Sequence, residues 1–250
     1  MLGLMQQRPL LISSLLDYAE RYHAGTEIVS RSVEGPLHRS NWGLIASRAR
    51  RVANALKRLG VTGSERIATL ALNHNRHLEI YFGVTCSGAI LHTVNPRLFP
   101  DQVRFILDDA EARYVFFDVA FTALIEQIAP RLPNVRGFVA LCECSALPSI
   151  EVPNLLCYEE LLASESDEYA WPLFDENTAS ALCYTSGTTG NPKGVLYSNR
   201  STVIHALAAA MPDTLNLSAR DSILPVVPMF HANAWSLPYA CTLVGAKMVF

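Results

Sequence analysis

The apolar positions near the start of the chain recur with the spacing of a helix. Leu11, Leu15, Tyr18 and Tyr22 lie three or four residues apart and form one stripe. This spacing predicts a first helix that buries these four side chains against the rest of the protein.

A second helix is predicted to begin near Ser40 and Asn41 and to end at Gly60. Its apolar face carries Ile45, Ala49, Val52, Leu56 and Leu59. Its opposite face carries Arg48, Arg50, Arg51, Lys57 and Arg58. A basic helix face can bind a membrane surface, but we expect this one to be a solvated surface of the protein.

Short, continuously apolar runs alternate with helical segments over the next part of the chain. Strands are predicted at residues 67–72, 89–94, 114–117 and 135–141, and helices at residues 78–87, 100–110 and 121–132. Because these strands are apolar throughout, both of their faces should be covered by helices. The pattern predicts an α/β fold with parallel or mixed sheets, followed by an irregular connection over residues 142–177.

From Ala179 onward the sequence predicts a new set of strands and helices. Strands are predicted at residues 179–184, 195–198, 223–227 and 246–250, with helices at 202–211 and, in part, 232–244. We expect a first α/β subdomain over residues 1–178, which includes the connecting segment, and the start of a second over residues 179–250. Because the chain stops inside an apolar strand, we expect it to be a truncated piece of a longer protein.

Composition narrows the class of protein. Half of the 250 residues are apolar, 17% are charged and the net charge is −3, which favours a folded domain with a sizeable core. No basic block is present, so a nucleic acid is not an expected partner. The start of the chain lacks the features of a signal peptide, and no apolar run approaches the roughly 18 residues of a membrane span, so a cytoplasmic location is expected.

The cysteines show no paired spacing. Six are present, and Cys142 and Cys144 form a lone C-x-C. Reduced and partly buried thiols are therefore expected in preference to a zinc site or disulfides.

One polar run is unsuited to a packed core. Residues Tyr184–Gly194 read YTSGTTGNPKG. Its glycines allow successive backbone N–H groups to turn toward one point, its hydroxyls add donors and Lys193 adds a positive charge. This composition suits a polyphosphate, although a plain surface turn is the simpler alternative for a shorter match.

Two other enzyme classes fit the run poorly. The loop of nucleoside triphosphatases reads G-x-x-x-x-G-K-[ST], and counting from Gly187 places Pro192 at the second glycine and Gly194 at the Mg²⁺-binding hydroxyl. The G-x-S-x-G elbow of hydrolases is absent around Ser186.

The run resembles the phosphate-binding signature of the AMP-forming acyl-activating enzymes, which include acyl-CoA synthetases, firefly-type luciferases and peptide-synthetase adenylation domains. A second segment, VVPMFHANAW at residues 226–235, is similar to the next motif of that family in the form found in medium- and long-chain fatty acyl-CoA ligases. The resemblance extends over the whole chain, including NPRLFPDQV from residue 95, and corresponds to the N-terminal part of such an enzyme.

The resemblance implies an activity. Family enzymes join a carboxylate to the α-phosphate of ATP, release pyrophosphate, and transfer the acyl group from the adenylate to coenzyme A. A medium- or long-chain fatty acid is the substrate implied for the full-length protein. Two alternatives stay open: a short acid such as 3-methylmercaptopropionate, and a non-catalytic nucleotide-binding protein.

The resemblance also implies site residues. Thr185 would bind Mg²⁺, and the phosphates of ATP would be held by Thr185, Ser186, Gly187, Thr188, Thr189, Gly190 and Lys193. His231 would be the catalytic residue beside the adenylate and the acyl carboxylate, Ala232 would leave room for the acyl adenylate, and Trp235 would gate the acyl site. A homodimer is implied as well. Because further family residues, including the catalytic lysine, would lie beyond Phe250, the 250-residue piece alone is expected to be inactive.

Overall fold

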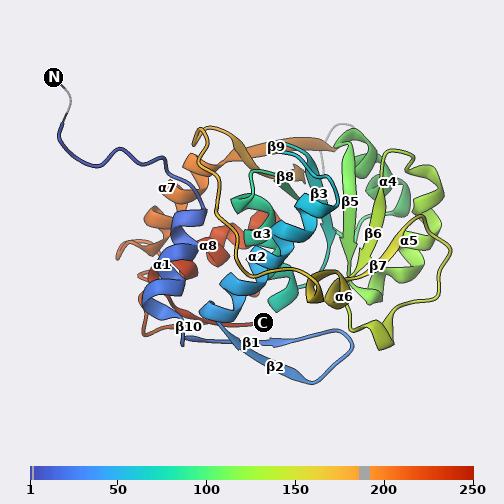
Figure 1. The fold of residues 1–250 in the computed structure, drawn as a ribbon, viewed down its shortest axis with the longest axis horizontal. Coiled ribbons are helices and arrows are strands. Elements are labelled where there is room, and N and C mark those ends of the chain that lie inside the picture. The colour runs from blue at the N-terminus through green and yellow to red at the C-terminus, as the bar shows by residue number, and fades with distance from the viewer. Residues whose placement is uncertain (2, 186–191) are drawn as a thin grey trace.

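Two β-sheets organise the protein (Figure 1). The structure is a computed structural model that describes residues 1, 3–185 and 192–250. The larger sheet has seven strands in the order β7-β6-β5-β3-β4-β8-β9, and the smaller has four in the order β10-β11-β1-β2. The predicted α/β fold with mixed sheets flanked by helices is confirmed.

The larger sheet is parallel except at one edge. Its strands in chain order are β3 (Arg66–Leu70), β4 (Ile90–Thr93), β5 (Ala112–Phe117), β6 (Gly137–Ala140), β7 (Leu155–Cys157), β8 (Ala179–Thr185) and β9 (Lys193–Ser198). Within the described residues, β8 and β9 form the one antiparallel pair of this sheet. The apolar runs of the inner strands are buried on both faces, as expected for parallel strands covered by helices.

The smaller sheet joins the two ends of the chain. It contains β1 (Glu27–Arg31), β2 (Leu37–Asn41), β10 (Ser222–Ile223) and β11 (Lys247–Val249). Strand β1 pairs in parallel with β11 and antiparallel with β2. In the larger sheet, β8 pairs in parallel with β4. Both sheets therefore combine strands from before and after residue 178, and the expected subdomain boundary there stays a prediction.

Helices cover both faces of the larger sheet (Figure 1). The α-helices of the described residues are α1 (Ser13–His23), α2 (Trp42–Arg58), α3 (Asn75–Cys86), α4 (Pro100–Asp109), α5 (Thr122–Ile128), α6 (Tyr158–Ala163), α7 (Asn199–Ala210) and α8 (Leu237–Val244). One core lies between the sheet and the α2–α3 pair, and a second lies between the sheet and the α4–α5 pair. None of the helices in the described ranges combines the length and the apolar character that a membrane crossing requires.

Helix α1 is present, but its buried face differs from the predicted stripe. Leu15, Leu16 and Ala19 are buried, whereas Tyr18 and Tyr22 are exposed, with ring centroids 5.0 Å apart. Tyrosine carries a polar tip and tolerates the surface, so the smaller aliphatic residues decide which side of the helix faces the core.

Helix α2 has the predicted ends. The side chain of Asn41 caps its start by accepting a hydrogen bond from the backbone N–H of Leu44 at 2.9 Å. Gly60 follows its end with φ +74°, a left-handed conformation that glycine adopts without strain.

The basic face of α2 is not simply solvated, which corrects the prediction for this helix. Arg50 donates to Glu20 at 2.8 Å, and Arg58 donates to Glu165 at 2.5 Å. Both guanidinium groups therefore bind carboxylates from other parts of the fold. Sequence spacing did not reveal these partners because Glu165 lies far along the chain.

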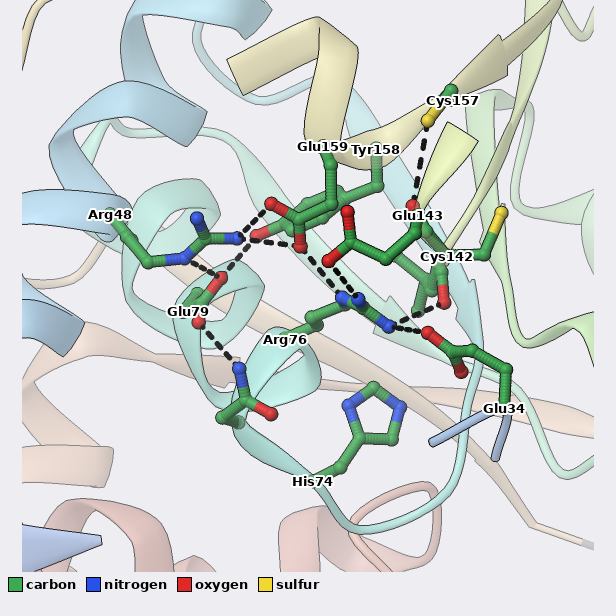
Figure 2. Close-up of polar contacts among 12 residues, drawn as sticks. Glu34, Arg48, His74, Arg76, Glu79, Cys142, Glu143, Cys157, Tyr158 and Glu159 are labelled. Atoms are coloured by element: carbon green, nitrogen blue, oxygen red, sulfur yellow. Dashed lines mark hydrogen bonds and ion pairs between the residues drawn. The ribbon is translucent and has the colours of Figure 1, made fainter. Parts of the chain in front are cut away.

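Arg48, on the same helix, belongs to an ionic group that is largely buried (Figure 2). We call this group the arginine–carboxylate cluster; its members are Arg48, Arg76, Glu34, Glu79, Glu143 and Glu159. Glu79 is fully buried and lies 2.8 Å from the Nε atom of Arg48. Arg76 donates to Glu159 at 2.8 Å and also contacts Glu34 and Glu143.

Burial disfavours the charged form of both arginines, but the carboxylates outweigh this effect. Glu79 and Glu159 raise the pKa of Arg48 above its usual value, and Glu34 and Glu159 raise that of Arg76. The cluster therefore holds α2, α3 and α6 together as charged partners.

The segment over residues 142–177 is more ordered than predicted. It contains β7, which extends the larger sheet, and α6. Strand β7 is only three residues long, and its contribution depends on pairing with β6, so the local sequence carried little signal of it.

The expectation that all cysteines are reduced is wrong for one pair. Cys144 and Cys157 form a disulfide, with Cα atoms 5.6 Å apart. Pairing of β6 with β7 brings the two residues together, a contact that spacing along the chain does not predict. The four other cysteines are free and buried.

Candidate active site

The predicted phosphate-binding run lies at the β8–β9 hairpin. Thr185 is the last residue of β8, and Lys193 is the first residue of β9 and its partner across the hairpin. The Thr185 hydroxyl donates to the carbonyl oxygen of Lys193 at 3.5 Å, and both residues are exposed. The other predicted phosphate-binding residues, Ser186, Gly187, Thr188, Thr189 and Gly190, lie outside the described residues.

A cavity of about 270 Å³ lies beside Thr185. Thr185 and Tyr184 line it from the end of β8, and Thr93 lines it from the end of β4. His231 and Ala232 line it as well. The cavity therefore lies at the carboxyl ends of neighbouring parallel strands, where ligands of open α/β sheets bind.

A second cavity of about 570 Å³ adjoins the first. Ala232 and Tyr197 line both cavities and so form the wall between them. Trp235 lines only the second, together with Ala208 and Leu215 among others. An apolar ligand group could occupy this space while its polar end lies beside His231.

The turn that follows His231 and borders the larger cavity has an unusual backbone. Ala232, Asn233, Ala234, Trp235 and Ser236 all have positive φ, between +43° and +57°. None is glycine, so each costs about 1–2 kcal/mol relative to a right-handed conformation. Strain of this kind persists only where surrounding contacts impose it, and it is common at ligand sites.

Buried polar side chains hold the turn in place. The thiol of Cys183 donates to Oδ1 of Asn233 at 2.7 Å, and the Thr93 hydroxyl lies 3.4 Å from the same atom. Burial raises the pKa of Cys183, so this thiol stays protonated and can donate. Asn233 thereby links the turn to the ends of β4 and β8.

The structure brings most of the described candidate residues together. Thr185, His231 and Ala232 line one cavity, and Ala232 and Trp235 line the adjoining one. Lys193 stands opposite Thr185 in the hairpin.

Sequence reasoning missed Tyr197 and Asn233. Tyr197 lies on β9, three residues after the recognised run, and Asn233 lies inside the second motif. Neither closely follows a predicted parallel strand, so no sequence signal marked them. Asn95, which lines the smaller cavity, does follow such a strand, and this position could have identified it.

Two further contacts shape the cavity wall. The hydroxyl of Tyr184 donates to Oδ2 of Asp109 at 2.6 Å, and burial, together with this carboxylate, raises the pKa of Tyr184. The guanidinium of Arg97 lies 5.5 Å from the ring centroid of Phe230, within the range of a cation–π interaction.

Comparison with known proteins identifies the class. The sequence model of the AMP-binding enzyme family matches residues 17–250, so the chain belongs to the AMP-binding enzyme family. The family resemblance of the two motifs is thereby confirmed.

Curated relatives share about half of their length with this chain. A medium-chain-fatty-acid–CoA ligase of Ectopseudomonas oleovorans is 51% identical over 249 residues, which are 100% of this chain and 46% of that protein. A 3-methylmercaptopropionyl-CoA ligase of Ruegeria lacuscaerulensis is also 51% identical over 249 residues, with the same coverage.

A solved structure shows the same fold. The anthranilate CoA ligase AuaEII in complex with anthranoyl-AMP superposes with a TM-score of 0.81 at 25% identity, over 94% of this chain and 44% of that protein.

Proposed function

We propose that the full-length protein is an ATP-dependent acyl-CoA ligase for a medium- or long-chain fatty acid. A carboxylate oxygen of the acid attacks the α-phosphorus of ATP, the bond to pyrophosphate breaks, and an acyl adenylate forms. The thiol sulfur of coenzyme A then attacks the acyl carbonyl carbon, loses its proton, and AMP leaves.

One observation carries the proposal. Thr185, at the end of the predicted phosphate-binding run, and His231 line the same cavity, and a larger cavity adjoins it across Ala232 and Tyr197. A nucleotide phosphate beside Thr185 and an alkyl chain beside Trp235 would place a carboxylate near His231. The two cavities thus match the two ends of an acyl adenylate.

The chain's own residues supply the chemistry expected of such a site. Donors in the hairpin and the charge of Lys193 would stabilise negative charge that develops on the phosphates. The imidazole of His231 would pack against the adenylate and donate a hydrogen bond to it. Trp235, which is exposed at the larger cavity, would control entry of the alkyl chain.

The described residues would supply Mg²⁺ with few of its ligands. Among them, no group of three or more His, Cys, Asp or Glu side chains could hold a metal ion. The hydroxyl of Thr185 is an oxygen ligand of the kind that Mg²⁺ accepts, and Mg²⁺ at nucleotide sites takes most of its ligands from phosphates and water. Bound there, it would neutralise phosphate charge.

A short acid is the second candidate substrate. The relative named as a 3-methylmercaptopropionyl-CoA ligase is as similar to this chain as the medium-chain ligase is. The larger cavity has room for an alkyl chain, and this observation favours the longer acids. A cytoplasmic location and a homodimer also stay predictions.

The test is an assay of the full-length enzyme by ATP–pyrophosphate exchange with straight-chain acids of increasing length and with 3-methylmercaptopropionate. We expect the highest kcat/KM with acids longer than about six carbons, because each buried methylene adds binding free energy of about 0.8 kcal/mol. Activity confined to shorter acids would favour the second candidate. Nucleotide binding without exchange for any acid would favour a non-catalytic role.

A further inference from the structure

The turn between β3 and α3 reaches the segment that carries His231. Asn73 lies in this turn, and its side-chain amide donates to the carbonyl oxygens of Pro225 at 3.0 Å and Val227 at 3.2 Å. Its Oδ1 atom accepts a hydrogen bond from the backbone N–H of Met229 at 2.6 Å. One side chain thus binds backbone groups of three alternate residues, 225, 227 and 229.

These contacts replace an expected strand. A strand was predicted over residues 223–227, but β10 ends at Ile223. Pro225 and Pro228 lack the backbone N–H that a sheet ladder needs, so the segment cannot pair regularly along both edges. Asn73 supplies the hydrogen bonds that a neighbouring strand would otherwise provide.

The turn that carries Asn73 is itself firmly held. His74 lies 2.8 Å from Oδ1 of Asp118, and Oδ2 of Asp118 accepts from the backbone N–H of Leu72 at 2.7 Å. His77 contacts the carbonyl oxygen of Leu72 at 2.9 Å and the hydroxyl of Thr69 at 3.0 Å. His74, Asp118 and His77 are all buried, so Asn73 projects from a rigid base.

Met229 connects this base to the cavity. Its backbone N–H binds Asn73, and its carbonyl oxygen accepts a hydrogen bond from the Tyr81 hydroxyl. Two residues later, the N–H of His231 donates to the carbonyl oxygen of Pro228 at 3.0 Å. The path of the backbone into His231 is therefore determined by side chains from β3–α3.

We propose that Asn73 is a positioning residue: by binding residues 225–229 it places Phe230 and His231 in the cavity that also contains Thr185. This inference rests on the proposed function, since it assigns Asn73 a role in the adenylation step. Asn73 does not line either cavity described above and would act only through the backbone.

The first test compares Asn73→Ala with a matched variant in the full-length enzyme. Asn54→Ala is the control, because Asn54 also donates to two distant backbone carbonyls, those of Ser166 at 2.8 Å and Glu168 at 3.0 Å, away from both cavities. We expect kcat for pyrophosphate exchange to fall at least about tenfold in Asn73→Ala, because a displacement of about 1 Å at a reacting centre can cost on the order of 100-fold. The KM for ATP should stay within about twofold, and Asn54→Ala should keep the wild-type kcat.

A second variant tests the chemistry of the side chain. Asn73→Asp keeps the acceptor for Met229 but turns a carboxylate toward the carbonyl oxygens of Pro225 and Val227. Protonation of this carboxylate restores one donor, so the activity of Asn73→Asp relative to wild type should rise as the pH falls. A constant ratio across the pH range would overturn the proposal, as would equal losses of kcat in Asn73→Ala and Asn54→Ala.

A third measurement separates this inference from the proposed function. Hydrogen exchange of the peptide that spans residues 225–236 should be faster in Asn73→Ala than in wild type and unchanged in Asn54→Ala. An enzyme that adenylates no carboxylic acid would refute the proposed function while this measurement still reports on the Asn73 contacts. Unchanged exchange in Asn73→Ala would overturn the inference even in an active ligase.

Discussion

Two regions of the molecule are held together by opposite means. In the arginine–carboxylate cluster, side-chain charges bind other side-chain charges, and Glu79 is fully buried (Figure 2). In residues 225–236, which we call the His231 segment, neutral side chains form the hydrogen bonds, Asn73 to backbone atoms and Cys183 to the Asn233 side chain, and five successive residues have positive φ. The cluster joins helices, whereas the His231 segment borders the two cavities.

Because the two regions are held by different interactions, substitutions in the cluster should affect mainly stability, and substitutions that change the His231 segment should affect mainly activity. A buried charge that loses its partner costs several kcal/mol, so the cluster should tolerate little change without loss of stability. Hydrogen bonds between neutral groups contribute only about 1 kcal/mol each, so contacts of the His231 segment can be removed with less effect on folding. Their expected effect is on the placement of reacting groups.

The largest effect on stability is expected from Glu79→Ala. Glu79 binds Arg48 at 2.8 Å and accepts from the Tyr158 hydroxyl at 2.8 Å and the Asn75 amide at 2.9 Å. Its removal takes away one of the two carboxylates that bind Arg48 and leaves two buried donors without their acceptor, so we expect the free energy of unfolding to fall by about 3–5 kcal/mol in urea titrations.

Glu143→Gln is the matched control for this cluster. The Glu143 side chain is 65% exposed and lies 3.3 Å from Arg76. Its loss should change the free energy of unfolding by less than about 1 kcal/mol. If Glu79→Ala and Glu143→Gln lowered the free energy of unfolding equally, buried and exposed members of the cluster would contribute alike to stability.

Next in size is the effect of Thr185→Ala and Lys193→Ala on adenylation. Each removes a group proposed to contact phosphate, so the rate of pyrophosphate exchange should fall by on the order of 10²-fold. Both residues are exposed, so thermal unfolding should be nearly unchanged. Thr185→Ser keeps the hydroxyl and should retain most of the rate; wild-type exchange in both alanine variants would contradict the site.

An effect on the pH dependence of stability, small near neutral pH, is expected from His92→Phe. His92 is fully buried on β4, neither ring nitrogen has a hydrogen-bond partner within residues 1, 3–185 and 192–250, and burial lowers its pKa to about 3. Between this value and about 6.5 the unfolded state binds more protons, so stability falls as the pH decreases through this window, by up to about 1.4 kcal/mol per pH unit.

Replacement by phenylalanine should remove this contribution and flatten the curve of unfolding free energy against pH below about 6.5. The unfolding free energy of His92→Phe will still depend on pH in this range, because burial also lowers the pKa of His77 to about 3. Parallel curves for wild type and His92→Phe between pH 4 and pH 6 would show that His92 is protonated in the folded protein.

The smallest effect is expected from Trp235→Ala, at the end of the His231 segment. Trp235 is 64% exposed, so stability should change little. Because its indole lines the larger cavity, the ratio of kcat/KM for long and short acids should change by about tenfold, with the KM for ATP nearly constant. If kcat/KM varied with acid length in the same way in wild type and Trp235→Ala, Trp235 would not be a gate.

Periodicity predicted much of the fold because burial leaves a direct mark on the sequence. The inner strands of the larger sheet and the ends of α2 were predicted from apolar runs, Asn41 and Gly60. Strand β7 was missed because three residues carry almost no periodic signal. The stripe of α1 was misplaced because Tyr18 and Tyr22 are apolar in composition but exposed in the fold.

The residues of the candidate site also fall into those that the sequence predicted and those that only the structure revealed. Thr185, Lys193, His231 and Trp235 were named from the family resemblance of two short motifs, the first of which also has residue types that suit a polyphosphate. Tyr197 and Asn233 were not named, because their significance depends on which surfaces meet. Asn73 carried no chemical signal at all, since an asparagine after a strand is an ordinary turn residue until its partners are known.

By itself the sequence determined the class of fold, the family and the chemical character of the two motifs, because these depend on residues that are neighbours along the chain. Only the tertiary structure decided that residues of the first motif share a cavity with His231, that Ala232 and Tyr197 separate two cavities, and that Asn73 binds the segment before His231. The physical reason is that hydrogen bonds and cavity walls depend on distances in space, and the β-sheet brings together residues that lie far apart in the sequence.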